Sequence, residues 1–115
     1  MIVIVCGGRN YSNRDRVYSA LNAVHAKKTI KMLIQGGADG ADRIAKDWAM
    51  LIKGIQVVTF HASWIPLGGA AGPIRNANML IMKPDGLIAF NGGDGTKGMI
   101  ALAESGDVKV WRVPE

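Results

Sequence analysis

The sequence contains one cysteine, two histidines and only 6% aromatic residues, and each shortage excludes a class of protein. Cys6 alone cannot form an internal disulfide, which favours a cytoplasmic protein. No group of histidine, cysteine and aspartate has the spacing of a metal site, and no Ser-His-Asp set is indicated. We therefore expect neither a metal nor a bound cofactor, and we interpret Cys6 as a small core residue.

Long apolar runs and an excess of acidic residues are also missing. No apolar stretch approaches the roughly 20 residues that a membrane-spanning helix needs, so we expect no contact with a membrane. Met1 to Cys6 is apolar from its second residue and leads into a glycine turn, which indicates a buried strand rather than a signal peptide. Fourteen lysines and arginines against nine acidic residues give a formal net charge of +5. This charge favours anionic partners: nucleotides, nucleic acid or phosphorylated metabolites.

Glycine is abundant instead, with 15 residues, and it follows several short apolar runs. These runs predict strands, and the segments between them have apolar residues at helical spacing. The expected strands are residues 1–6, 31–35, 55–60, 87–90 and 108–113. The alternation predicts one α/β domain over residues 1–115, with a five-stranded, mostly parallel sheet in the order 3-2-1-4-5 and helices on both faces.

Four helices are expected between these strands, each with one face in the core. Ser12 or Asn13 caps the first, Pro73 lies in the first turn of the third, and the fourth runs from Lys97 to Ser105. The expected core faces are Val17, Ala20, Leu21 and Val24 in the first helix, Ala41, Ile44, Ala45, Trp48 and Ala49 in the second, and Ile74, Ala77 and Ile81, with Met79 or Leu80 beside them, in the third.

Glycine turns follow the first, second and fourth predicted strands. They are Gly7-Gly8-Arg9-Asn10-Tyr11, Gly36-Gly37-Ala38-Asp39-Gly40-Ala41-Asp42 and Asn91-Gly92-Gly93-Asp94-Gly95-Thr96. Because the carboxyl ends of parallel strands share one edge, these turns and the irregular segment 61–69 meet at a crevice between strands one and four. Glycine lets the backbone approach a ligand, and free N–H groups at a helix start attract an anion. We therefore expect a phosphate-binding crevice rather than three bare turns.

Each candidate residue has a functional interpretation and a structural alternative. Backbone N–H groups of the glycine turns and the Thr96 hydroxyl bind phosphate oxygens, while Arg9 either clamps phosphate or forms a surface salt bridge. Asp39 and Asp42 accept from ribose hydroxyls or cap their loop. Tyr11 and Trp64 stack on a base or pack in the core. The expected ligand-binding set is Gly7, Gly8, Arg9, Asn10, Tyr11, Gly36, Gly37, Ala38, Asp39, Asp42, Arg75, Asn76, Asn91, Gly92, Gly93, Asp94, Gly95 and Thr96.

The turns, together with Ala71-Gly72-Pro73-Ile74-Arg75-Asn76, resemble in order and spacing the motifs of one superfamily across essentially the whole chain. This is the SLOG superfamily, which includes the DNA-processing protein DprA and the LOG (lonely guy) cytokinin-activating enzymes. The most similar group is the small YpsA-related one of bacteria and phages. The resemblance implies a Rossmann-like three-layer sandwich that binds nucleotides or nucleotide-derived molecules at these loops.

The resemblance also implies alternatives in function. LOG enzymes release a base from a nucleoside monophosphate with a Gly-Gly-x-Gly-Thr-x-x-Glu motif, and Met99 stands here at the position of its glutamate. A thioether cannot exchange a proton, so we favour a sensor or sequestering protein over a nucleotide hydrolase. Catalytic residues stay unassigned, with Asp39, Asp42 and Asp94 as weak candidates. A DprA-like single-stranded DNA binder ranks third, because few aromatic residues accompany the basic ones. LOG-type enzymes form dimers, so we also expect self-association.

Overall fold

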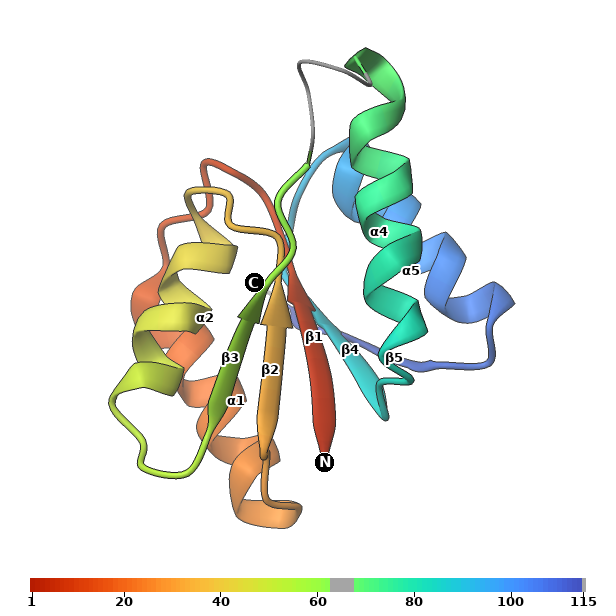
Figure 1. The fold of residues 1–115 in the computed structure, drawn as a ribbon. Helices are drawn as coiled ribbons and strands as arrows, with labels where there is room; N and C mark the ends of the chain where they lie inside the picture. Colours follow the sequence, from red (N-terminus) through yellow and green to blue (C-terminus); the bar gives the residue numbers. More distant parts are fainter. Residues whose placement is uncertain (63–67, 115) are drawn as a thin grey trace.

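The computed structural model describes residues 1–62 and 68–114 and contains a parallel five-stranded sheet. The strands are β1 (Ile2–Cys6), β2 (Met32–Gln35), β3 (Gln56–Thr59), β4 (Gly86–Ala89) and β5 (Lys109–Arg112). Their order is β3-β2-β1-β4-β5, and every neighbouring pair is parallel. The predicted strand order and α/β class are therefore confirmed. In Figure 1 the arrowheads of β1, β2 and β3 all point to the edge at which the glycine turns begin.

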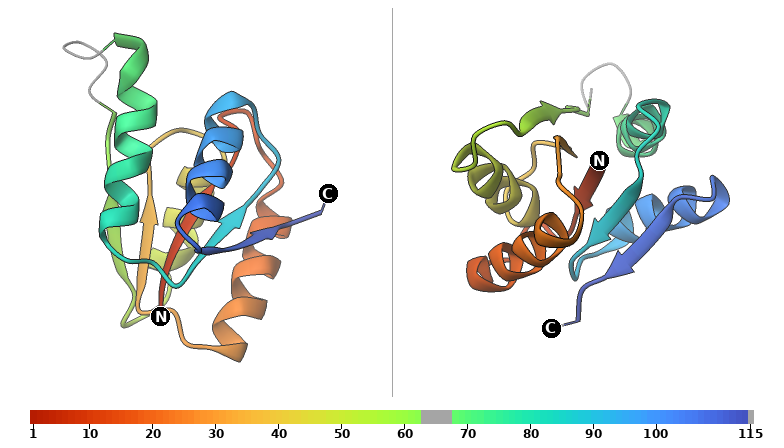
Figure 2. Two further views of the ribbon diagram at one scale, coloured as in Figure 1. Left: turned by 90° about the vertical axis from the view of Figure 1, so that its right-hand side faces the viewer. Right: turned by 90° about the horizontal axis from the view of Figure 1, so that it is seen from below.

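Helices cover both faces of the sheet, as expected for a three-layer sandwich (Figures 1 and 2). Helices α1 (Arg14–Lys27) and α2 (Ala41–Met50) lie on one face, and α4 (Ala71–Ile81) and α5 (Asp94–Ser105) on the other. A short 3-10 turn, η1 (Gly68–Ala70), leads into α4. No helix in the described part of the chain is both long enough and apolar enough to cross a membrane.

Two hydrophobic clusters hold these layers together, and β1 contributes to both. Val3 and Val5 face α1 and α2, whereas Ile4 faces the cluster that contains Met79 of α4 and Met99 of α5. Successive residues of a strand point to opposite faces, so a continuous apolar run is what a strand covered on both sides requires. The predicted core face of α2, from Ala41 to Ala49, is buried throughout.

The predicted core face of α4 is wrong for Ile74, Ala77 and Ile81, and it is confirmed for Met79. Ile74 is 42% exposed and Ile81 is 73% exposed, and Ala77 is exposed as well, while Asn76 and Met79 are buried. The helix is rotated in this way because its polar side chains make hydrogen bonds beneath it. Asn76 accepts from Arg75 Nε at 2.9 Å and donates to the Gly95 carbonyl at 3.4 Å. Such bonds inside the protein favour burial of a polar face that periodicity alone assigns to solvent.

Two helix starts refine the expectations. Asn13, one of the two predicted caps, accepts from the Arg16 N–H with its side-chain oxygen at 3.0 Å. Helix α5 begins at Asp94 rather than Lys97, with Gly93 as its N-cap. Asp94 was expected to precede the helix, and the difference arises because the glycine turn continues directly into the helical backbone. The last helix ends as expected, with Gly106 as its C-cap.

Candidate functional site

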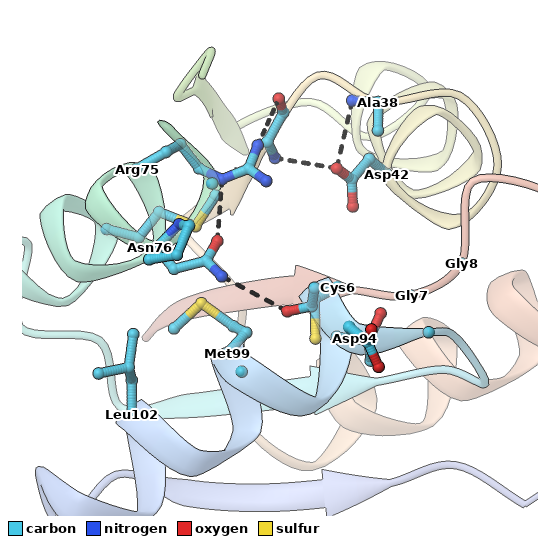
Figure 3. A pocket seen from close by; sticks show the side chains of 18 of the residues that line it. Cys6, Gly7, Gly8, Ala38, Asp42, Arg75, Asn76, Asp94, Met99 and Leu102 are labelled. Atoms are coloured by element: carbon cyan, nitrogen blue, oxygen red, sulfur yellow. Dashed lines mark hydrogen bonds between the residues drawn. The ribbon is translucent and has the colours of Figure 1, made fainter. Parts of the chain in front are cut away.

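A cavity of about 710 Å³ opens at the carboxyl edge of the sheet, between the loops after β1 and β2 and helices α4 and α5. Figure 3 shows side chains from these elements directed toward a common space. From the expected set, the cavity brings together Gly7, Gly8, Arg9, Gly36, Ala38, Asp42, Arg75, Asn76, Gly93, Asp94, Gly95 and Thr96. The predicted convergence of three glycine turns and the start of α4 is therefore present in the fold.

The other expected residues lie elsewhere. A second, smaller hollow of about 450 Å³ is lined by Asn10, Tyr11, Asn91 and Gly92, together with Ser12 and Asn13. Gly8, Arg9 and Gly93 line both spaces, so the two spaces adjoin at the first and third glycine turns. Gly37 and Asp39 line neither space, and Trp64 lies outside the described residues. The Tyr11 ring packs against Phe90 with a centroid distance of 5.4 Å.

The first turn of α5 presents donors to the cavity. Its N-cap is Gly93, which has no side chain that could accept from the first N–H groups of the helix. The Gly93 carbonyl accepts from the Lys97 N–H at 3.1 Å, which is the first hydrogen bond of the helix. The N–H groups of Asp94, Gly95 and Thr96 therefore precede the helical hydrogen bonds and have no acceptor within the helix. These N–H groups and the helix dipole favour an anion at this end. Gly93 and Gly95 line the cavity, and a Cβ on either would meet no atom within 4 Å, so there is open space beside both residues.

Arg75 and Asn76 tie α4 to the opposite wall of the cavity. Arg75 Nη1 donates to the Gly36 carbonyl at 3.0 Å and to the Phe60 carbonyl at 3.4 Å. Its Nε donates to Asn76, which in turn donates to the Gly95 carbonyl (Figure 3). This chain of bonds joins the loop after β2 to the start of α5. Within residues 1–62 and 68–114, Nη2 of Arg75 has no hydrogen-bond partner, so this nitrogen can donate to a ligand.

Asp42 is the buried carboxylate of the cavity, with 6% of its surface exposed. One of its oxygens accepts from the N–H groups of Gly36 at 3.2 Å and Ala38 at 3.3 Å. Burial raises the pKa of the Asp42 carboxyl to about 6, against the opposing effects of the Ala38 N–H, the Arg75 charge and the Gly36 N–H. This carboxyl therefore titrates close to neutral pH, unlike an exposed aspartate.

Gln35 was missed by the reasoning from sequence. It is fully buried, its amide nitrogen donates to the Thr59 hydroxyl, and its amide oxygen accepts from the Gly37 N–H at 2.5 Å. These bonds fix the backbone of the second glycine turn where Gly37 adopts a φ of +76°. A polar residue that ends an apolar strand directly before two glycines is the signal in the sequence that indicates this role.

The floor of the cavity is apolar. Met79 and Met99 are buried there beside the partly exposed Leu102, and Cys6 lies at the end of β1. Burial raises the pKa of the Cys6 thiol to about 12, and the nearby Asp42 charge acts in the same direction. The thiol therefore stays protonated and is not a nucleophile, because the thiolate is the reactive form. Met99, at the position of the LOG glutamate, packs into the hydrophobic cluster on this side of the sheet.

Comparisons with known proteins agree with this architecture. DNA processing protein A from Helicobacter pylori, whose structure was described for its single-stranded DNA binding mode, has a similar fold. Its TM-score is 0.74 with 15% sequence identity, and the match covers 100% of this chain and 66% of that chain. The chain thus spans slightly less than two thirds of that protein, and at this identity the likeness shows the fold alone.

Similarity at the level of sequence is more specific. The gene 61 protein of Mycobacterium phage D29 is 34% identical over 93 residues, which cover 76% of this chain and 74% of the phage protein. Residues 1–65, more than half of the chain, match the family model described as YspA, cpYpsA-related SLOG family. These residues include the first two glycine turns, Gln35 and Asp42. The chain therefore belongs to the YspA, cpYpsA-related SLOG family.

Proposed function

We propose that this protein binds a nucleotide or a nucleotide-derived molecule in the 710 Å³ cavity, as a cytoplasmic sensor or sequestering protein. The observation that carries the proposal is the meeting of three glycine turns with an uncapped helix start at one cavity. Ligand pockets for small molecules commonly have volumes of about 300–1,000 Å³ and combine an apolar lining with a few polar groups. The Met79, Met99 and Leu102 floor and the donors of α5 have this character.

The polar and apolar parts of the cavity suggest how the ligand lies. The phosphate is placed at the first turn of α5, where N–H groups and the Thr96 hydroxyl are donors. Arg9, from the loop after β1, and Arg75, from α4, both line the cavity and add positive charge. The base is placed over the apolar floor, where it removes methionine and leucine surface from water. The net charge of +5 raises the local concentration of such an anionic ligand.

Thermal unfolding in the presence of a ligand panel tests the proposal. A ligand that binds only the native state raises the midpoint of unfolding. The panel contains AMP and the other ribonucleoside monophosphates, ADP, ADP-ribose, NAD and cyclic nucleotides. We expect at least one to stabilise the wild-type protein and not the Gly93→Val variant, which adds a bulky side chain at a residue that lines the cavity. No shift with any member at millimolar concentration contradicts the proposal.

A matched control separates blockage of the cavity from an effect on folding. Gly69 also has no atom within 4 Å of an added Cβ, but it does not line the cavity. Gly69→Val should therefore keep the ligand response that Gly93→Val loses. Equal loss in both variants would mean that the valine acts through the fold and not through the cavity.

Single-stranded DNA binding is a second candidate, supported by the fold shared with DNA processing protein A and by the positive net charge. Such binding uses basic grooves with aromatic side chains for stacking, and it weakens steeply with salt. The aromatic candidate at the rim, Tyr11, packs against Phe90, so the nucleotide proposal ranks first. Fluorescence anisotropy of a labelled oligothymidylate at 50 and 200 mM salt tests this candidate. Tight, salt-dependent binding that Gly93→Val leaves unchanged would favour a DNA surface outside the cavity.

Nucleotide hydrolysis of the LOG type is not favoured, because Met99 is buried in the hydrophobic cluster and carries no carboxylate. Hydrolysis of a glycosidic bond normally requires carboxyl groups at the sugar. We expect no release of adenine from AMP above background when the products are followed by chromatography. Turnover on the order of 1 per second or more would show an enzyme instead. Asp39→Asn, Asp42→Asn and Asp94→Asn would then identify the catalytic carboxylate.

A further inference from the structure

Asp42 presents a fixed acceptor to the cavity. Its carboxylate is 6% exposed, and one oxygen is held by the N–H groups of Gly36 and Ala38. Figure 3 shows the other oxygen directed away from these two donors, toward the side of the cavity formed by Cys6 and Gly7. No hydrogen bond to this second oxygen is found within residues 1–62 and 68–114. The carboxylate thus has one occupied side and one side free for a ligand.

The neighbouring cation does not neutralise this carboxylate by direct pairing. Within the described residues, the ion pairs are Arg14–Asp47 and Arg112–Glu104, both on the surface. Arg75 lies near enough to influence Asp42 electrostatically, but its guanidinium donates to the Gly36 and Phe60 carbonyls and to Asn76. A buried carboxylate needs further donors to offset the loss of its hydration. A hydrogen-bond donor on a bound molecule would supply the missing bond to the second oxygen of Asp42.

The position of Asp42 indicates which part of a nucleotide supplies that donor. A carboxylate is an acceptor only and repels phosphate, so the phosphate belongs at the first turn of α5. One backbone segment, Gly7–Gly8, separates the two places. The Gly8 carbonyl accepts from the Ala41 N–H at 3.3 Å, next to Asp42, and the Gly8 N–H donates to the Asn91 carbonyl at 2.8 Å. Asp42 and the first turn of α5 line the same cavity. With the phosphate at α5 and the base on the apolar floor, the hydroxyls of the sugar are the donors of a nucleotide that remain for Asp42.

We propose that Asp42 accepts a hydrogen bond from a ribose hydroxyl, so that the cavity selects ribonucleotides over nucleotides that lack this hydroxyl. This inference rests on the proposed function and specifies its ligand class. The same specificity would distinguish the cavity from a site for DNA, whose sugar has no 2′-hydroxyl. The N–H groups of Gly36 and Ala38 hold the carboxylate in position, and Arg75 holds the Gly36 carbonyl.

Calorimetric titration with matched pairs of ligands tests the inference. The probes are the four ribonucleoside monophosphates, each compared with its 2′-deoxy and 3′-deoxy counterpart, and inorganic phosphate. We expect at least one ribonucleotide to bind about 10-fold more tightly than one of its deoxy counterparts, as is typical when a charged acceptor loses its donor. Equal affinity for the ribonucleotide and both of its deoxy counterparts, in every set that binds, overturns the inference and leaves the proposed function standing. If no nucleotide binds at millimolar concentration, the proposed function fails and the inference fails with it.

Asp42→Asn separates recognition of the hydroxyl from organisation of the loop. Asparagine keeps an acceptor for the Gly36 and Ala38 N–H groups but removes the charged acceptor on the ligand side. We expect the ratio between ribo and deoxy affinities to fall to about 3-fold or less, because a hydrogen bond to a neutral group is weaker. Affinity for inorganic phosphate should stay within about 2-fold of the wild type or rise. An unchanged ratio overturns the inference. If the variant does not fold, the ratio between ribo and deoxy affinities of the wild-type protein alone decides whether the inference holds.

Discussion

The hydroxyl of Thr96 occupies the space that a Cβ on Gly92 would need, and the same Cβ would lie 2.7 Å from the Gly8 nitrogen. Gly92 is therefore fixed by the packing of the protein itself. The next residue, Gly93, has open space within 4 Å and lines the cavity. Adjacent glycines of one turn thus have different roles: Gly92 lets two loops and a helix start meet, and Gly93 leaves room for a ligand.

Alanine substitutions at the two positions should differ in how strongly they lower the stability of the fold. Gly92→Ala should lower the free energy of unfolding by about 1–3 kcal/mol, because the methyl group overpacks a rigid contact. Gly93→Ala should lower it by less than Gly92→Ala does, because its methyl group meets no atom within 4 Å and only the preference for glycine over alanine at an N-cap is lost. Urea unfolding of the two variants measures the difference. Equal stability of both variants would show that Thr96 and Gly8 move aside freely.

Asp42 should make stability depend on pH in a defined direction. Its pKa rises from 3.8 to about 6 on folding, so between these values the folded protein binds more protons than the unfolded chain. The contribution of Asp42 to the free energy of unfolding is therefore largest below pH 3.8, falls as the pH rises and no longer changes above about pH 6. At about 1.4 kcal/mol for each pKa unit, the full effect is on the order of 3 kcal/mol.

Asp42→Asn removes this titration. The free energy of unfolding of the variant, minus that of the wild type, should increase by about 3 kcal/mol or somewhat less between pH 4 and pH 7. Urea unfolding of both proteins at each pH gives the difference. A difference that is constant with pH, or that decreases, would mean that the Asp42 pKa is not raised in the folded protein.

Asp94 should weaken the binding of anions. It is the first residue of α5, it is exposed, and it lines the cavity beside the N–H groups assigned to phosphate. Asp94→Asn should raise the affinity for inorganic phosphate and AMP by about 3- to 10-fold at low salt, and this gain should shrink as salt screens the charge. Weaker binding by the variant would show instead that Asp94 accepts a hydrogen bond from the ligand.

The exposed face of α4 should mediate self-association. Ile74, Ala77 and Ile81 share one side of this helix and leave apolar surface in water. Light scattering at micromolar concentration should give about twice the chain mass of 12.3 kDa. Ile81→Lys should give the monomer, whereas Met50→Lys, at an equally exposed apolar residue of α2, should leave the dimer intact. A monomeric wild type, with and without nucleotide, contradicts this prediction.

The strand order and the meeting of the glycine turns could be predicted from the sequence, because both follow from short apolar runs separated by glycine. The inward face of α4 could not, since it depends on the hydrogen bond from Asn76 to the Gly95 carbonyl, a contact between distant segments. The role of Gln35 depends likewise on Thr59 in the next strand. Sequence also does not distinguish a glycine that packs closely, Gly92, from one that faces open space, Gly93.

Amide chemical shifts of the ¹⁵N-labelled protein, followed by NMR during titration with AMP and then ADP-ribose, test most directly whether the cavity binds nucleotides. The largest shifts should come from the backbone N–H groups of Gly8, Gly36, Gly95 and Thr96, which surround the cavity, and Gly93→Val should abolish them. Shifts concentrated outside this set, or no shifts with either ligand at millimolar concentration, would contradict nucleotide binding at the junction of the three glycine turns.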